Sequence, residues 1–406
     1  MPKKALVRSA DVWNTMQDAA EFGIVSEGLQ LNWQRVMERK NRLIGSFVGG
    51  KGPYLEKMGV DLVMGEAQFI SPEAIQVGDT TYTANRFLIG VGSDSARPPI
   101  PGIEHAITSK EILFTERLPK SMVVIGGGII GMEFAHIMAS AGTKVTLLHR
   151  SERVLPMVDR DSAEAIQEIS KKMGIDLQLR ADIEKIEQID DNQLVVHAQV
   201  GDRSLQIEAE VVLVATGRRP NIVGLQLDAA GVEYTNRGIK VNEYLQTTAE
   251  KIYAAGDAIG GYMFTPIAAH QAKVAVRNAL RGNELKPNYE HMTNAIFTQP
   301  PISGVGMTEQ EAREKELDIV VAKASYNQSG TAILLGETEG HIKIIADKQT
   351  GALLGAHFVG ADADELIHMM TIAIKAKLTV QDFEEIIPVH PTLAEFLIET
   401  TRGMLS

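Results

Sequence analysis

The stretch that decides the fold is residues 122–131, Met122-Val123-Val124-Ile125-Gly126-Gly127-Gly128-Ile129-Ile130-Gly131. Residues 122–125 predict a short apolar strand, and the glycines after it have the spacing Gly-x-Gly-x-x-Gly. A helix is expected over residues 132–141 and a second apolar strand over residues 144–149. A strand, a glycine turn, a helix and a strand form a βαβ unit with parallel strands. The stretch therefore predicts a parallel α/β domain.

Three glycines of this turn, Gly126, Gly128 and Gly131, predict a binding site for a dinucleotide. They permit a tight turn, close approach of backbone N–H groups to a pyrophosphate, and close packing of the helix on the strand. The positive end of the helix then favours the phosphates. A glycine-rich turn that binds nothing is the alternative, and the flanking strand and helix favour the nucleotide. Ile129 and Ile130 belong to the predicted site.

The end of the second strand bears on which nicotinamide dinucleotide binds. An NAD site usually has Asp or Glu there, which accepts hydrogen bonds from the ribose 2′-OH. This chain has His149 instead, followed by Arg150 and Arg153. Cations at this place pair with a 2′-phosphate, so the residues favour NADP over NAD, which stays open. A solvated basic loop is the alternative interpretation.

Composition and charge exclude several classes of protein. Lys plus Arg is 40 and Asp plus Glu is 52, and the formal net charge of −12 gives no support to nucleic-acid or anionic-membrane binding. The 406 residues contain no cysteine, so disulfide frameworks, thiolate metal sites and thiol catalysis by these residues are excluded, and no metal site is predicted. No apolar run is long enough to span a membrane, and the basic start Met1–Arg8 lacks the apolar core of a signal peptide. A cytoplasmic location is the default expectation.

The rest of the chain extends outward from the βαβ unit. Helices are expected over residues 6–20 and 31–44, with an extended segment at residues 22–25. Short strands with turn signals follow between residues 60 and 92, and residues 97–102 form a Pro-rich linker. The later expected elements are a helix at 161–173, strands up to 217, and, between 287 and 406, strands at 295–298, 342–346 and 352–359 with helices at 309–315 and 364–377.

Two segments repeat one pattern, an apolar strand that enters a glycine turn. They are residues 88–93 and residues 213–218, and in the second copy Thr216 lies 216 − 126 = 90 residues after Gly126. The same offset from Val91 leads to residue 1, where no glycine fingerprint stands. Either the repetition is chance, or a first dinucleotide fold has lost its opening strand, turn and helix. We favour the second explanation.

Three further motifs have both a functional and a structural interpretation. Asp257 ends a Gly-Asp turn where a carboxylate accepts hydrogen bonds from sugar or ribityl hydroxyls, although Asp after Gly is also ordinary turn chemistry. Glu395 lies in the first turns of a helix expected to begin at Pro391, where it either orients the imidazole of His390 or serves the helix start. Glu133 is either the buried partner of a lysine or a solvated side chain.

Taken together, these motifs resemble the pyridine nucleotide–disulfide oxidoreductases, which include dihydrolipoamide dehydrogenase, mercuric reductase and glutathione reductase. The start Pro2–Leu6 resembles the segment after the family's redox cysteines, and residues 126–133 resemble its NAD(P) fingerprint. The resemblance also covers Ala215–Pro220, Thr247–Asp257, Phe297–Pro300 and His390–Glu395. It implies an α/β fold with two Rossmann-like dinucleotide-binding domains, the first truncated, and a C-terminal α+β dimerisation domain. The implied boundaries are 1–119 with 242–290 for FAD, 120–241 for NAD(P) and 291–406 for dimerisation.

The resemblance implies roles for individual residues in hydride transfer from nicotinamide to flavin to an acceptor. Lys4, or alternatively Lys3, approaches the flavin and pairs with Glu133, and Asp257 binds the ribityl chain of FAD. His390 and Glu395 form an acid–base dyad that reaches the active site of the partner subunit in a homodimer. The remaining implied cofactor-binding residues are Ala67, Gly92, Ser93, Ile183, Gly217, Met263, Phe264, Thr265 and Pro266.

Several family features are missing from the sequence. The first Gly-x-Gly-x-x-Gly and both redox cysteines are absent, and Val91 and Gln299 stand where the family usually has other residues. The remaining strands of the FAD domain are expected to form a sheet with an open edge. A start codon assigned too far downstream is the favoured explanation over a truncated gene.

Three functions remain open at this point. The first is an FAD- and NAD(P)H-dependent oxidoreductase whose thiol–disulfide step is impossible in the residues given. The second is a cysteine-free transhydrogenase or diaphorase, in which hydride passes between nucleotides or to an external acceptor. The third is a dimeric NAD(P)-binding protein that has lost flavin and catalysis.

Overall fold

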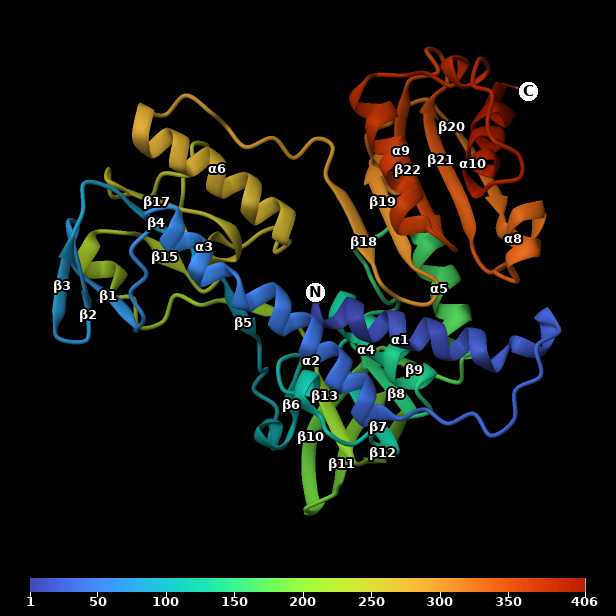
Figure 1. Ribbon diagram of the computed structural model, residues 1–406, viewed down its shortest axis with the longest axis horizontal. Helices are drawn as coiled ribbons and strands as arrows, with labels where there is room; N and C mark the ends of the chain where they lie inside the picture. Colours follow the sequence, from blue (N-terminus) through green and yellow to red (C-terminus); the bar gives the residue numbers. More distant parts are fainter. Residues whose placement is uncertain (406) are drawn as a thin grey trace. The chain divides into compact units, whose positions relative to one another are not determined.

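The computed structural model describes residues 1–405 of the chain, which divides into two compact units (Figure 1). The first unit comprises Met1–Gly45, Arg97–Thr216 and Glu290–Ser406, and the second comprises Ser46–Ala96 and Gly217–Tyr289. Within the described residues, none of the helices combines the length and the apolar character that crossing a lipid bilayer requires. The three domain boundaries expected from the sequence stay a prediction.

The first unit contains a five-stranded parallel sheet in the order β6-β13-β7-β8-β9. Helix α4 (Ile129–Ser140) connects β7 to β8, so the predicted βαβ unit is confirmed. Helix α5 (Arg160–Lys172) connects β8 to β9. The strands are β6 (Ile107–Thr108), β7 (Ser121–Ile125), β8 (Lys144–His149), β9 (Asp176–Leu179) and β13 (Val211–Val214).

Both faces of this parallel sheet are covered. Met122 and Val124 of β7 pack in one core with α4 and α5. Val123 and Ile125 point to the opposite face and pack in a second core with the antiparallel sheet β10-β11-β12. Burial of both faces explains why residues 122–125 are all apolar. The covering strands are β10 (Ala181–Asp190), β11 (Gln193–Val200) and β12 (Arg203–Ala209).

The C-terminal part of the first unit is an antiparallel sheet in the order β18-β19-β22-β21-β20. Helices α9 and α10 lie against this sheet and share a core with it (Figure 1). The alternation of strands and helices expected here is confirmed. The elements are β18 (Thr293–Ile296), β19 (Ile302–Gly306), α7 (Glu309–Glu314), β20 (Ile319–Ser325), α8 (Gly330–Leu335), β21 (His341–Asp347), β22 (Leu353–Val359), α9 (Ala363–Lys375) and α10 (Leu393–Arg402).

Two N-terminal helices pack on the core of the parallel sheet. Helix α1 (Pro2–Gln17) buries Leu6 and Val7 in the core that also contains α4. Helix α2 (Trp33–Gly49) contributes Trp33, whose Nε1 donates a hydrogen bond of 3.0 Å to the carbonyl of Thr115. These contacts bring the start of the chain to the parallel sheet.

The second unit is built from small sheets. Strand β4 pairs in parallel with β17, and among the described residues it has no strand on its other edge. Leu88 of β4 is 40% exposed, so this sheet has the open edge that the sequence predicts. The elements are α3 (Lys51–Lys57), β1 (Ala67–Ser71), β2 (Ala74–Val77), β3 (Thr80–Thr83), β4 (Phe87–Ile89), β5 (Ser93–Ser95), β14 (Arg218–Pro220), β15 (Tyr234–Thr235), β16 (Gly238–Ile239), β17 (Ile252–Ala254) and α6 (Thr265–Arg281).

Two local expectations are wrong, and one helix was not predicted. Residues 22–25 are not extended, because a 3-10 turn ends there and Gly23 adopts a left-handed φ of 73°. Helix α3 was not predicted, since its glycine and proline are typical of turns. Helix α10 begins at Leu393 rather than at Pro391, because Thr392 accepts a 3.0 Å hydrogen bond from the N–H of Glu395 and caps the helix.

Candidate functional site

The glycine turn between β7 and α4 is built so tightly that only glycine fits at two positions. Gly126 has a φ of 116°, and an ideal Cβ on it would lie 2.4 Å from the carbonyl oxygen of Ala215. An ideal Cβ on Gly131 would lie 1.8 Å from the carbonyl oxygen of Gly126. A side chain at either position would therefore force the strand and the helix apart.

The third glycine, Gly128, leaves the start of α4 open. It is the N-cap residue of α4 and, having no side chain, leaves the first N–H groups of the helix without a side-chain cap. An ideal Cβ on Gly128 meets no atom within 4 Å. The first N–H groups of a helix have no partner inside the helix. Ile129 and Ile130 at this end are half-buried. The turn thus fits the phosphates of a dinucleotide, which need backbone donors and the positive end of a helix.

His149 lies at the end of β8 beside this turn. Its Nδ1 accepts a hydrogen bond of 3.0 Å from the N–H of Gly127. Burial lowers the pKa of His149, and the neighbouring Arg150 guanidinium lowers it further, against a backbone contact with Arg153 that raises it. The ring is therefore neutral at pH 7. This leaves the exposed Arg150 and the half-buried Arg153 as the cations at the place predicted for a 2′-phosphate.

Two other predicted residues lie outside this turn. Ile183 is half-buried on β10 and packs against the core beneath that sheet. Gly217 belongs to the second unit, has a φ of 135°, and its carbonyl accepts a hydrogen bond of 3.0 Å from the N–H of Ala96.

Glu133 on α4 is a buried carboxylate that pairs with a lysine of α1, and the lysine is Lys3. The Nζ of Lys3 donates to Glu133, which is 1% exposed and also accepts a hydrogen bond of 3.0 Å from the N–H of Phe297. Of the two lysines that the sequence offers as partners of Glu133, the alternative Lys3 is confirmed and Lys4 is wrong. Lys4 pairs instead with Asp364 at 2.5 Å and lies over the ring of Phe297, because neighbouring residues of a helix point about 100° apart.

A polar cluster in the second unit surrounds the carboxylate of Asp257. The hydroxyl of Ser93 donates a hydrogen bond of 2.5 Å to Asp257 Oδ2. Arg218 donates from Nε to the Ser93 hydroxyl and from Nη2 to its carbonyl, both at 2.7 Å, and its Nε lies 3.7 Å from Asp257. Two interactions thus hold one oxygen of Asp257, which is partly exposed. The arrangement fits a carboxylate that accepts hydrogen bonds from ligand hydroxyls.

The two repeated segments of the sequence meet in this cluster. Strand β5 pairs antiparallel with β14, and Ser95 lies opposite Arg218. Gly92, with a φ of 71°, accepts a hydrogen bond of 2.9 Å from the N–H of Asn221. The second copy therefore supplies the cation that holds the first copy's serine. No role was predicted for Arg218 from the sequence, although its place directly after a repeated glycine turn is a signal that could have identified it.

The residues predicted before α6 lie at its start. The helix begins at Thr265 with Pro266 in its first turn, after the half-exposed Met263 and Phe264. Gln271 of α6 accepts a hydrogen bond of 2.7 Å from the N–H of Gly256, next to Asp257. Ala67, by contrast, is an exposed residue of β1 that pairs with Val77.

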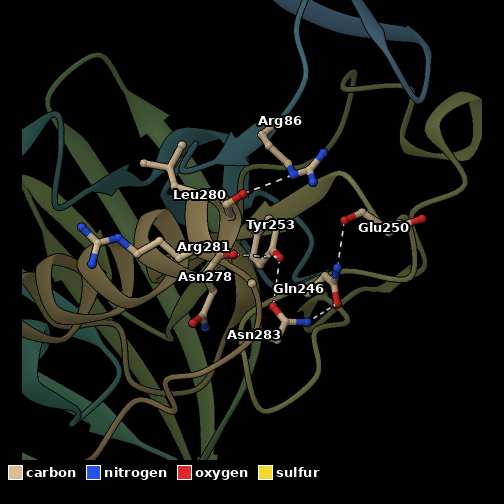
Figure 2. A pocket seen from close by; sticks show the side chains of 10 residues that line it. Arg86, Gln246, Glu250, Tyr253, Asn278, Leu280, Arg281 and Asn283 are labelled. Atoms are coloured by element: carbon tan, nitrogen blue, oxygen red, sulfur yellow. Dashed lines mark hydrogen bonds between the residues drawn. The ribbon is translucent and has the colours of Figure 1, made fainter.

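A cavity of about 320 Å³ lies at the other end of the β4 and β17 strands. Figure 2 shows Tyr253, Asn283 and Gln246 joined there by hydrogen bonds, with Arg86 beside the end of α6. Arg86 and Glu250 precede β4 and β17, whereas Ser93 and Asp257 follow them. In open parallel sheets ligands bind at the carboxyl ends of strands, so this cavity is not part of the candidate site.

His390 and Glu395 come together as predicted from the sequence. The imidazole Nδ1 lies 2.9 Å from Glu395 Oε2, and the side chain of His390 is 79% exposed. The carboxylate thus occupies Nδ1 of an imidazole that is largely exposed. Among residues 1–405, no group of three or more His, Cys, Asp or Glu side chains is placed to hold a metal ion.

Comparison with known protein families gives two matches that together cover most of the chain. Residues 1–272 match the model of the pyridine nucleotide-disulphide oxidoreductases. Residues 292–401 match the dimerisation domain of the same family.

Curated relatives and solved structures agree with these matches. Mercuric reductase of Bacillus cereus is 36% identical over 98% of this chain, which spans 63% of that protein's length. A dihydrolipoyl dehydrogenase of Bacillus subtilis is 32% identical over 98% of this chain and 88% of its own length. The HOCl-induced flavoprotein disulfide reductase RclA from Escherichia coli superposes with a TM-score of 0.88 at 30% identity, over 99% of this chain and 89% of that one. This chain therefore belongs to the pyridine nucleotide-disulphide oxidoreductases, flavoproteins that bind FAD and NAD(P)H.

Proposed function

We propose that this chain is a homodimeric oxidoreductase that transfers a hydride from NAD(P)H to FAD and then to an acceptor, in the cytoplasm. The observation that carries the proposal is the turn from Gly126 to Gly131, which leads into an uncapped helix start. Family membership supports the same activity, and the dimerisation-domain match supports the homodimer.

The nicotinamide dinucleotide is assigned to the first unit. The N–H groups at the start of α4 would hold its pyrophosphate, and the open space beside Gly128 admits it. Arg150, which is exposed directly after β8, and Arg153 are the cations that we assign to a 2′-phosphate, which favours NADP. NAD is the second choice. His149 at the same place is neutral at pH 7, so the imidazole itself adds no charge that would select a 2′-phosphate over a hydroxyl.

The flavin dinucleotide is assigned in part to the second unit. Asp257 accepts hydrogen bonds from the ribityl hydroxyls, while Ser93 and Arg218 keep its carboxylate in place. Gly92 and the start of α6 at Met263–Pro266 complete the site that we assign. No second Gly-x-Gly-x-x-Gly for the flavin pyrophosphate occurs in residues 1–405. When bound, the flavin supplies two-electron chemistry between the nicotinamide and the acceptor.

Charged side chains of the first unit are assigned to proton and charge control. Glu133 neutralises Lys3 and holds it against α4. We therefore assign Lys3 to the flavin, in addition to Lys4, which was predicted there and pairs with Asp364. Glu395 orients His390, which donates and accepts protons at Nε2 on behalf of the acceptor. In a homodimer this dyad would serve the partner subunit.

The acceptor is either a disulfide or another small molecule. The residues given contain no cysteine, so electrons cannot pass through a thiol pair of these residues. A second candidate is thus a transhydrogenase or diaphorase without cysteines, and a third is a dimeric NAD(P)-binding protein without flavin.

The visible absorption spectrum of the purified chain, recorded before flavin is added, tests the proposal. A flavin band at about one per subunit supports it. A colourless protein that still binds NADPH supports the non-catalytic alternative, and a protein that binds neither refutes all three candidates.

The variant His390→Ala separates the two catalytic candidates in the flavin-containing protein. If an external acceptor takes the electrons without a thiol, NADPH oxidation with that acceptor stays near the wild-type rate. A collapse of that rate in His390→Ala contradicts the transhydrogenase or diaphorase and supports an acid–base role. The variant His105→Ala is the control, because His105 lies on a surface 3-10 turn of the first unit, outside the assigned site.

A further inference from the structure

The middle glycine of the turn, Gly127, is held at both of its peptide groups, by the last residue of β8 and by the segment that follows β8. Its N–H donates to His149 Nδ1 at 3.0 Å. Its carbonyl accepts a hydrogen bond of 2.8 Å from the N–H of Leu155. Gly127 is not one of the three glycines in the Gly-x-Gly-x-x-Gly spacing, so neither the motif nor the proposed function assigns it a contact.

The imidazole of His149 packs directly against this glycine. An ideal Cβ on Gly127 would lie 2.8 Å from His149 Cγ and 3.0 Å from Val154 Cγ1. The ring thus occupies the volume that any side chain at residue 127 would need. Ring and turn form one packed unit, which couples the orientation of the peptide to the presence of the imidazole.

The hydrogen bond defines the state of the ring. Since Nδ1 accepts a proton from a backbone N–H, the ring proton lies on Nε2. Burial and the Arg150 guanidinium lower the pKa of His149, which agrees with a neutral ring. The Nε2 atom is itself buried. Since Nε2 is closed off, the ring acts on a ligand only through the Gly127 peptide that Nδ1 holds.

We propose that His149 is a positioning residue for dinucleotide binding: its Nδ1 holds the Gly127 peptide so that the N–H groups of the next residues face the ligand phosphates. The inference rests on the proposed function, since it assumes that the turn binds NAD(P). His149, at the end of β8, then has a task other than the discrimination between the ribose 2′-OH of NAD and the 2′-phosphate of NADP. Arg150 and Arg153 keep that second task.

Two substitutions of His149 separate its role as a hydrogen-bond acceptor for Gly127 from its role in filling the space beside the turn. In His149→Leu the Cδ1 carbon takes the place of Nδ1 and offers no acceptor, whereas in His149→Asn the amide oxygen restores an acceptor at the same distance from the backbone. NADPH and NADH binding is measured by nucleotide fluorescence, without turnover. We expect His149→Leu to weaken both nucleotides about tenfold, which corresponds to about 1.4 kcal/mol, and His149→Asn to bind within about threefold of the wild type.

The matched control is His197→Leu, because His197 pairs with Glu187 on the β10–β11 sheet and makes no contact with the turn. Unchanged binding in His149→Leu, or equal losses in the Leu and Asn variants, overturns the inference while the proposed function stands. If the wild-type chain binds neither nucleotide, the proposed function and the inference fall together.

A second measurement observes the ring in the wild-type protein. The ¹⁵N resonances of histidine-labelled protein distinguish a protonated from an unprotonated Nδ1, and His149→Asn assigns the signal. An unprotonated Nδ1 at neutral pH is expected. A protonated Nδ1 overturns the inference.

Discussion

The substitution Lys343→Met tests the buried charge cluster that joins the parallel sheet to the C-terminal sheet within the first unit. The Lys343 side chain is fully buried on β21, with its Nζ 3.0 Å from Asp159 Oδ1, 3.3 Å from Asp161 and 2.6 Å from Glu309. Asp159 is also fully buried and caps α5. Methionine keeps the length of the side chain and removes only the charge and the donors.

The expected loss follows from what the substitution leaves behind. Asp161 and Glu309 retain Lys323 and Arg313 as partners, but within residues 1–405 Asp159 forms an ion pair with Lys343 alone. Removal of one member of a buried ion pair costs about 3–5 kcal/mol, because the remaining charge is desolvated without compensation. We therefore expect Lys343→Met to lower the free energy of unfolding of the first unit by about 3–5 kcal/mol.

Chemical denaturation at pH 7, followed by circular dichroism, measures this loss. The double variant Lys343→Met with Asp159→Asn should recover part of it, since the stranded carboxylate is then neutral. The control is Lys348→Met, which removes an exposed lysine 3.9 Å from Asp318 and should change stability by less than about 0.5 kcal/mol. A loss below about 1 kcal/mol in Lys343→Met, with an unchanged denaturant slope, refutes the reasoning.

Three other outcomes are expected. Burial lowers the pKa of His136 and of His341 to about 4, below the ordinary value of 6.5, so the unfolded chain binds more protons than the folded chain between these pH values. The free energy of unfolding should therefore fall as the pH drops from 6.5 to 4, by up to about 3 kcal/mol for each histidine. Denaturation midpoints that stay constant over this pH range would contradict the burial argument. Gly131→Ala places a Cβ against the Gly126 carbonyl and should abolish NADPH binding in fluorescence titration, so near-normal affinity would count against the turn. Arg218→Met should weaken flavin binding about tenfold, by loss of charged hydrogen bonds that position the Asp257 carboxylate, with Arg218→Lys intermediate; equilibrium dialysis of FAD checks both, and wild-type affinity in the Met variant would exclude a positioning role.

Much of the fold could be predicted because the relevant patterns are local. Residues 122–149 show an apolar strand, a glycine turn and a helix within one short stretch, and the structure has β7, α4 and β8 there. In the C-terminal part, β18, β21, β22, α7 and α9 were also predicted, with ends that differ by at most two residues, whereas β19 and β20 were not. The errors lie where local signals conflict, as in α3, whose glycine and proline are more typical of turns.

The candidate site was predicted less completely, because its contacts join residues far apart in the chain. The pairing of His390 with Glu395 spans five residues and was found from the motif. Arg218 reaches Ser93 over 125 residues, and no spacing rule predicts such a pair. The choice of Lys3 over Lys4 for Glu133 depends on how α1 is rotated against α4, which adjacent sequence positions cannot distinguish.

The sequence by itself determined the family, the parallel α/β character and the place of the dinucleotide turn, since strand and helix periodicity and the need for glycine act over a few residues. It also determined that these residues contain no thiol. Only the tertiary structure decided which charges meet: Lys343 with Asp159, Arg218 with Asp257, and His149 with the Gly127 peptide. These partners are brought together by the packing of whole sheets and helices, which no pattern within a few residues of the sequence specifies.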